Sequence, residues 1–93
     1  MKKAEKETIA REVNMAWCEW KKAQIAALIE SRDPASTPET RREAQLERDK
    51  KEAFYNGADY LASITGVEIE FDRVSRALDA RYWDLYFNPG KIK

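Results

Sequence analysis

The segment from Gly66 to Phe87, GVEIEFDRVSRALDARYWDLYF, decides the fold expected for this chain. At 100° per residue, its main apolar positions fall within an arc of about 80°, the stripe of an amphipathic helix. These positions are Val67, Phe71, Val74, Leu78, Tyr82 and Leu85. Thr65 and Glu68 have the spacing of a capping box, and Asn88-Pro89 stops the helical pattern. We therefore predict a helix over residues 66–87.

A shorter helix is the alternative interpretation of the same segment. Residues 67–71 alternate between apolar and acidic side chains, as a β-strand does, and Asp72 would then cap a helix that begins after it. No other part of the chain offers a strand for pairing, so the longer helix is preferred.

Two further helices are expected before this segment. Residues 4–31 contain neither glycine nor proline and predict one long helix. Thr37-Pro38-Glu39 then supplies a capping hydroxyl, a proline at the first helical position and an acid in the first turn. A second helix is predicted over residues 38–65, with a charged first half. Its second half carries an apolar arc, expected to face the core, of Ala53, Phe54, Ala58, Leu61 and Ile64.

Helices joined by short loops run antiparallel. The fold expected is therefore all-α: a single domain over residues 1–93, built as an up-down-up three-helix bundle with a long, partly polar second helix. In the first helix, Ile9, Val13 and Trp20 share one face, whereas Cys18 and Ile25 lie nearly opposite. A helix that is apolar on two sides either sits between two neighbours or lends one side to another chain.

The composition argues against several classes of function. Seventeen basic and 17 acidic residues leave no net charge to attract nucleic acid or an acidic membrane. The chain has no histidine and a single cysteine, so we expect no enzyme activity, no cofactor and no metal site. No apolar run reaches the roughly 20 residues of a membrane span, and the charged start lacks the pattern of a signal peptide. We expect a cytoplasmic protein.

Surplus apolar residues favour a non-enzymatic protein–protein interaction module. Tryptophan, tyrosine and arginine are frequent at the centres of interfaces, and several gather near the end of the segment 66–87. The candidate partner-binding residues are Trp83, Tyr86, Phe87, Ile69, Arg76, Cys18, Ile25 and Ile29. The partner is expected to be another protein or a second copy in a homodimer. Small inhibitors or accessory proteins fit this kind of sequence, including those that phages or mobile elements direct against a host defence complex.

A local resemblance supports a different hypothesis. Residues 61–67, LASITGV, followed by residues 74–78, VSRAL, resemble the helix-turn-helix of Lac repressor-type regulators, although the second motif arrives two residues later than in that family. The resemblance implies a DNA-binding regulator that uses residues 61–81. In that case the residues near phosphates or base edges would be Arg73, Ser75, Arg76 and Arg81. Four acids in the same region, with the absence of net charge, oppose this hypothesis.

Overall fold

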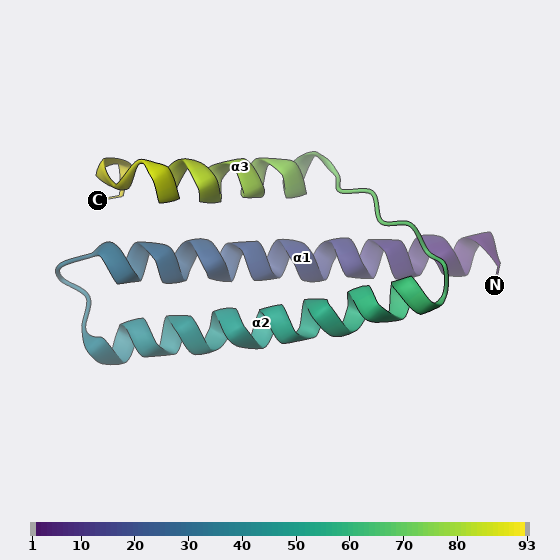
Figure 1. Cartoon of the computed structure of the whole chain (residues 1–93), viewed down its shortest axis with the longest axis horizontal. Helices are drawn as coiled ribbons and strands as arrows, with labels where there is room; N and C mark the ends of the chain where they lie inside the picture. Colours follow the sequence, from purple (N-terminus) through teal and green to yellow (C-terminus); the bar gives the residue numbers. More distant parts are fainter. Residues whose placement is uncertain (1, 93) are drawn as a thin grey trace.

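A computed structural model describes residues 2–92 and gives an all-α fold. Helix α1 spans Lys3–Arg32, α2 spans Pro38–Ile64 and α3 spans Arg73–Phe87, and a short 3-10 turn, η1, covers Pro89–Lys91. Helices α1 and α3 run in the same direction and α2 runs against them (Figure 1). The predicted up-down-up three-helix bundle is therefore confirmed.

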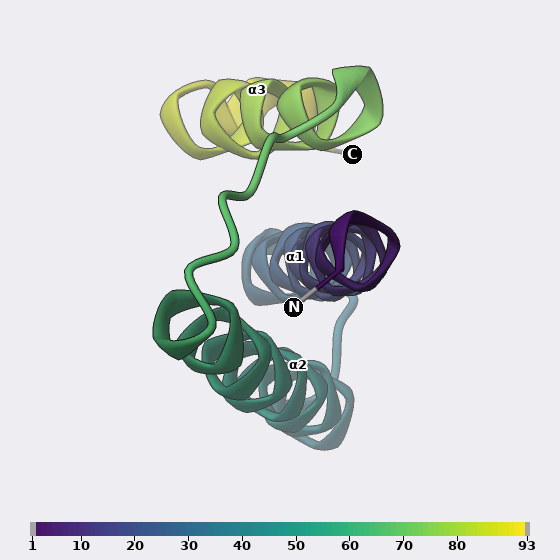
Figure 2. The ribbon, with the colours of Figure 1, turned by 90° about the vertical axis from the view of Figure 1, so that its right-hand side faces the viewer.

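Helix α1 is the middle helix of the bundle. It packs against both α2 and α3, whereas these two helices form no comparable interface with each other in the described part of the chain (Figures 1 and 2). The result is an elongated molecule of 51 × 25 × 15 Å. Its radius of gyration is 15.4 Å, against about 12 Å for a compact domain of this length. The two apolar sides of α1 are explained by its two neighbours.

The face that α2 turns toward α1 differs from the predicted one. Ala62 is buried with Val13 and Val67, and Ala58 packs against this cluster. Phe54, Leu61 and Ile64, which we expected in the core, are 68%, 49% and 63% exposed. Short alanine side chains let the backbone of α2 approach the larger residues of α1. Helix α2 is therefore rotated about its own axis relative to the predicted orientation, and its bulky residues lie on the outside.

Gly66 turns the chain out of α2 and does not begin the next helix. Its φ of +69° is a left-handed conformation that turns the chain away from the helix. The hydroxyl of Thr65 donates to the carbonyl of Leu61 at 2.8 Å, so it closes α2 and does not cap a new helix. Val67 then reaches back into the core beside Val13. The predicted helix start at residue 66 is therefore wrong.

Asp72 is the residue that starts α3. Its carboxylate accepts a hydrogen bond from the backbone N–H of Ser75 at 2.8 Å, and the helix begins at Arg73. Residues 67–72 are irregular in the structure, without a paired strand. The alternative interpretation was therefore right about the cap and wrong about the strand.

The other predicted helix ends are confirmed. The hydroxyl of Thr37 accepts a hydrogen bond from the N–H of Thr40 at 3.1 Å, immediately before Pro38. Helix α3 ends at Phe87, directly before Asn88-Pro89. These signals are local, because a cap and a proline act on the backbone within one turn.

Candidate interaction surfaces

A hydrogen-bonded cluster around the buried hydroxyl of Ser75 fixes the start of α3 on α1. The Asn14 side-chain amide donates to the Asp72 carboxylate at 2.9 Å, and the hydroxyl of Ser75 bonds to Asn14 and Asp72. The thiol of Cys18 lies 3.2 Å from the same hydroxyl. Ser75 is 0% exposed, so its hydroxyl depends entirely on these partners. The N–H and hydroxyl of Ser75 hold the pKa of the Asp72 carboxyl below its ordinary value.

A buried lysine joins the middle of α1 to α3. The ammonium group of Lys21 lies 3.2 Å from a carboxylate oxygen of Asp79. It also lies 5.2, 5.1 and 5.0 Å from the ring centroids of Trp17, Trp20 and Tyr82. Aromatic faces attract a cation at such distances. The cage thus compensates a charge that burial alone would disfavour.

Arg32 fixes the other end of α3. Its guanidinium donates to the carbonyl oxygens of Leu85 at 2.7 Å and Tyr86 at 3.0 Å. The last carbonyls of a helix have no partner within the helix, so a cation placed there satisfies them. The same guanidinium lies 5.4 Å from the ring centroid of Tyr86. Arg32 therefore positions the end of α3 that carries the aromatic side chains.

Four rings form a continuous cluster at this end, which we call the aromatic patch: Tyr82, Trp83, Tyr86 and Phe87. Trp83 stacks on Phe87 at 5.8 Å between centroids and meets Tyr86 edge-on at 5.6 Å. Trp83, Tyr86 and Phe87 are 45%, 44% and 71% exposed. The three aromatic residues predicted for partner binding are therefore together on the surface.

The tryptophans of α1 have partners elsewhere. Trp17 packs on Phe71, with centroids 4.9 Å apart, and Trp20 stacks on Tyr55 of α2 at 5.3 Å. The rings at the end of α3 pack mainly on one another. Of the patch, only Tyr82 meets the Trp17 and Trp20 region, through the Lys21 cage.

The remaining predicted contact residues lie mostly inside the bundle. Cys18 and Ile25 are buried, Ile29 is half-buried, and Ile69 packs against the core cluster of Val13. The structure does not join them to the aromatic patch as an open surface. Arg76 is exposed on α3.

The residues singled out for DNA contact are divided by the fold. Arg73, Arg76 and Arg81 are exposed, but Ser75 is buried against α1. Helices α2 and α3 lie on different sides of α1 (Figure 2). A helix-turn-helix requires its two helices to pack against each other, so the repressor-like resemblance does not extend to this arrangement.

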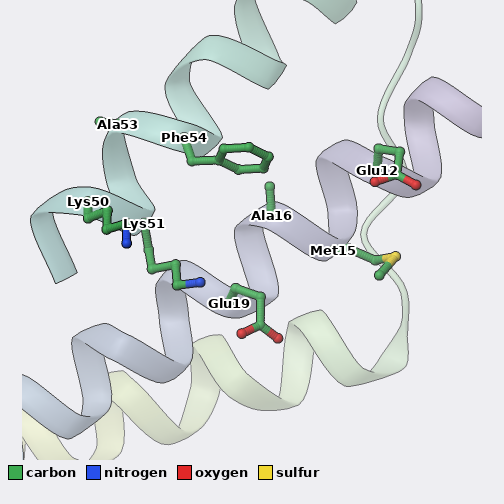
Figure 3. A pocket seen from close by; sticks show the side chains of 8 residues that line it. All are labelled: Glu12, Met15, Ala16, Glu19, Lys50, Lys51, Ala53 and Phe54. Carbon is green, nitrogen blue, oxygen red and sulfur yellow. The ribbon is translucent and has the colours of Figure 1, made fainter. Parts of the chain in front are cut away.

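An open groove lies between α1 and α2, on the side of the bundle away from α3. Its volume is about 560 Å³, and its apolar lining is formed by Met15, Ala16, Ala53 and Phe54. Phe54 and Ala16 point toward each other across it, and Lys51 extends toward Glu19 (Figure 3). The groove is thus an apolar slot with charged ends.

The sequence patterns missed both the caged lysine and this groove. Lys21 follows Trp17 by four residues and adjoins Trp20. A lysine within one helical turn of two tryptophans was therefore the available signal for a cation–π site. For the groove, the signal was the excess of bulky residues on α2 over those that one neighbouring helix can cover.

Neither a metal centre nor a membrane span emerges from the part of the chain that the structure describes. Residues 2–92 contain no group of three or more cysteine, aspartate and glutamate side chains gathered around a metal-sized site, and none of their helices has an apolar stretch that could cross a bilayer.

Comparison with known proteins finds no matching family model, no similar curated protein and no similar solved structure.

Proposed function

We propose that this chain is a non-enzymatic protein-binding module whose contact surface is the aromatic patch of α3. The observation that carries the proposal is the exposure of three mutually packed rings, Trp83, Tyr86 and Phe87, on one helix end. Aromatic side chains bury large areas and lose little conformational entropy on binding. Such clusters on a small protein are typical of contact sites.

The patch is held in place before any partner binds. Ring-to-ring packing restricts Trp83, and Arg32 anchors the backbone beneath Tyr86. Preorganisation lowers the entropic cost of association, so the same buried area gives tighter binding. This supports a role in stable recognition, as in an inhibitor or accessory protein.

The face of α3 also indicates the chemistry of the partner. Residues 76, 80, 83 and 87 recur at helical spacing, which places Arg76 on the same face as Trp83 and Phe87. A matching partner surface would have an apolar groove for the rings of Trp83 and Phe87. It would also carry an acidic group for Arg76, which lies about two helical turns from Trp83. This is the helix-in-groove mode of recognition.

The proposal is tested by affinity capture, with this chain as the bait and a lysate of the source cells as the sample. Trp83→Ala/Phe87→Ala should lose a protein that wild-type chain captures, because both anchors are removed. The matched control is Val74→Ala, which removes an exposed apolar side chain from the same helix at a position remote from the patch in helical angle. Circular dichroism checks that each variant folds. Identical capture by wild type and the folded double variant would contradict the proposal.

A further inference from the structure

Helix α2 carries a second apolar surface, separate from the aromatic patch. The part of its surface that α1 does not cover presents a line of side chains that we call the α2 stripe: Leu46, Ala53, Phe54, Gly57, Tyr60, Leu61 and Ile64. Five of these are large and are between 49% and 69% exposed. No other helix of the described chain covers this side, because α1 lies between α2 and α3 (Figures 1 and 2).

The stripe continues into the groove between α1 and α2. Ala53 and Phe54 belong to both, and Met15 forms the opposite wall (Figure 3). An apolar side chain that packed on Ala53 from outside would therefore enter the groove beside Phe54. The surface is a ridge with an adjoining slot, as required for interdigitating packing.

The surface area of the chain supports a second copy as the occupant. Its accessible surface is 6737 Å², whereas a compact monomer of 10.8 kDa exposes about 5,500 Å². The excess, about 1,200 Å², exceeds the roughly 800 Å² that each partner contributes to a standard interface. An interface on the α2 stripe would bring the exposed area into the range of ordinary folded proteins and still leave the aromatic patch free.

The charge pattern along α2 determines the direction of pairing. Within α2, residues 41–51 contain five basic and three acidic side chains, whereas residues 52–64 contain two acidic side chains and no basic one. An antiparallel pair keeps the basic segments of the two copies at opposite ends of the interface. A parallel pair would place like charges together, which is unfavourable. The antiparallel orientation is therefore the one that separates the like charges.

Gly57 lies at the middle of the stripe. A Cβ atom built at this position meets no atom within 4 Å, so the packing of the single chain does not require a glycine there. A glycine inside a helix costs about 1 kcal/mol relative to alanine. A close crossing with a second helix is a structural reason for glycine at such a position.

We infer that two copies of this chain associate through the α2 stripe, with their α2 helices antiparallel about a two-fold axis at Gly57. Residues equally distant from Gly57 along the helix then meet across the axis. Ala53 lies opposite Leu61 of the second copy, and Phe54 lies opposite Tyr60. Leu61 of the second copy fills the slot beside Phe54, and the interface is isologous.

Light scattering coupled to size exclusion tests the association. Wild type should elute as a dimer with twice the 10.8 kDa mass of one chain. Leu61→Glu should be a folded monomer, because this side chain is exposed in the single chain and its charge would be buried only in the dimer. Val74→Glu, an exposed apolar position on α3, should remain a dimer. A monomeric wild type at 100 µM or more, or a dimeric Leu61→Glu, would overturn the inference.

Cysteine cross-linking tests the axis and the direction. In an antiparallel pair, Gly57→Cys puts two thiols near the axis, where mild oxidation should cross-link most of the protein. Lys50→Cys lies seven residues away, so its two thiols would be about 20 Å apart and should not cross-link. Wild type controls for the buried Cys18. Equal cross-linking at both positions would indicate a parallel pair and overturn the antiparallel arrangement, as would absence of cross-linking at Gly57→Cys.

The two proposals fail separately. Loss of the dimer in Leu61→Glu leaves the aromatic patch intact, and Trp83→Ala/Phe87→Ala leaves the α2 stripe intact. A dimeric wild type whose capture list does not depend on Trp83 and Phe87 would support the α2 interface and contradict the aromatic contact surface. A monomeric wild type that captures a protein through those rings would do the reverse.

Discussion

Lys21 and Asp79 form the ion pair that joins α1 to α3, with 3.2 Å between the ammonium nitrogen and a carboxylate oxygen. The lysine side chain is 9% exposed and the aspartate side chain 44%, so the pair lies at the margin of the interface with its positive end inside. Three rings surround that end. The α1–α3 interface therefore includes a buried charge that is held by an ion pair and by cation–π contacts.

Replacing Lys21 should lower the free energy of unfolding. Lys21→Ala removes the ion pair, the cation–π contacts and the packing of the alkyl chain, and we expect a loss of about 1–3 kcal/mol. Lys21→Met keeps most of the volume, so it should lose less. Urea unfolding followed by circular dichroism measures both. A Lys21→Ala variant within about 0.5 kcal/mol of wild type would show that the cage does not stabilise the fold.

Ser75→Ala should weaken the start of α3. The substitution leaves the partly buried Asn14 amide oxygen without its hydroxyl donor, at an expected cost of about 1–3 kcal/mol. Ser63→Ala, an exposed serine on α2, should change the unfolding free energy by less than about 0.5 kcal/mol. Chemical denaturation compares the two. Equal stability of both variants would contradict a structural role for the Ser75 hydroxyl.

Asp72 should contribute to the acid sensitivity of the fold. Hydrogen bonds from Ser75 lower the pKa of this carboxyl from its ordinary value of 3.8. A lowered folded-state pKa gives stability that is fully present above the ordinary value and is lost as the pH falls through the folded-state value. Asp72→Asn lacks this titration, so the stability difference between wild type and variant should shrink below about pH 4. Thermal unfolding between pH 2 and pH 7 measures it, and a constant difference would contradict the prediction.

Arg32→Ala should loosen the last turn of α3. Removing the guanidinium leaves the carbonyls of Leu85 and Tyr86 without their side-chain donor, and charged hydrogen bonds contribute about 1.5 kcal/mol or more. Amide hydrogen exchange in this turn should accelerate roughly tenfold. Arg42→Ala, an exposed arginine on α2, is the control and should leave α3 unchanged. Unaltered exchange in Arg32→Ala would show that the helix end is held without this contact.

Gly57, inside α2, and Gly66, just after it, should respond in opposite ways to alanine. In a monomeric Leu61→Glu background, Gly57→Ala should raise the unfolding free energy by about 1 kcal/mol, since the site is helical and open. Gly66→Ala should lower it by about 1–2 kcal/mol, because the φ of +69° strains any residue with a Cβ. Urea titration distinguishes the signs. A stabilising Gly66→Ala would be inconsistent with the left-handed turn.

Every helix end except the start of α3 could be predicted to within one residue, because the signals for these ends are local. Thr37-Pro38 starts α2 and Asn88-Pro89 ends α3 in the structure, as expected from backbone hydrogen bonding within one turn. The clustering of Trp83 and Phe87 could also be predicted, since both lie on one face of one helix. The sequence therefore determined the fold class and three residues of the candidate surface.

Tertiary packing decided the rest. Val67 packs in the core with Val13 and Ala62, and Gly66 turns the chain so that this contact can form. Residues 66–72 are therefore not helical, although their apolar residues have helical spacing. The rotation of α2 depends on how its alanines fit against α1, and the burial of Lys21 depends on Asp79 from a distant helix. Periodicity records which residues share a face; which face is covered depends on the volumes and charges of residues far away in the chain.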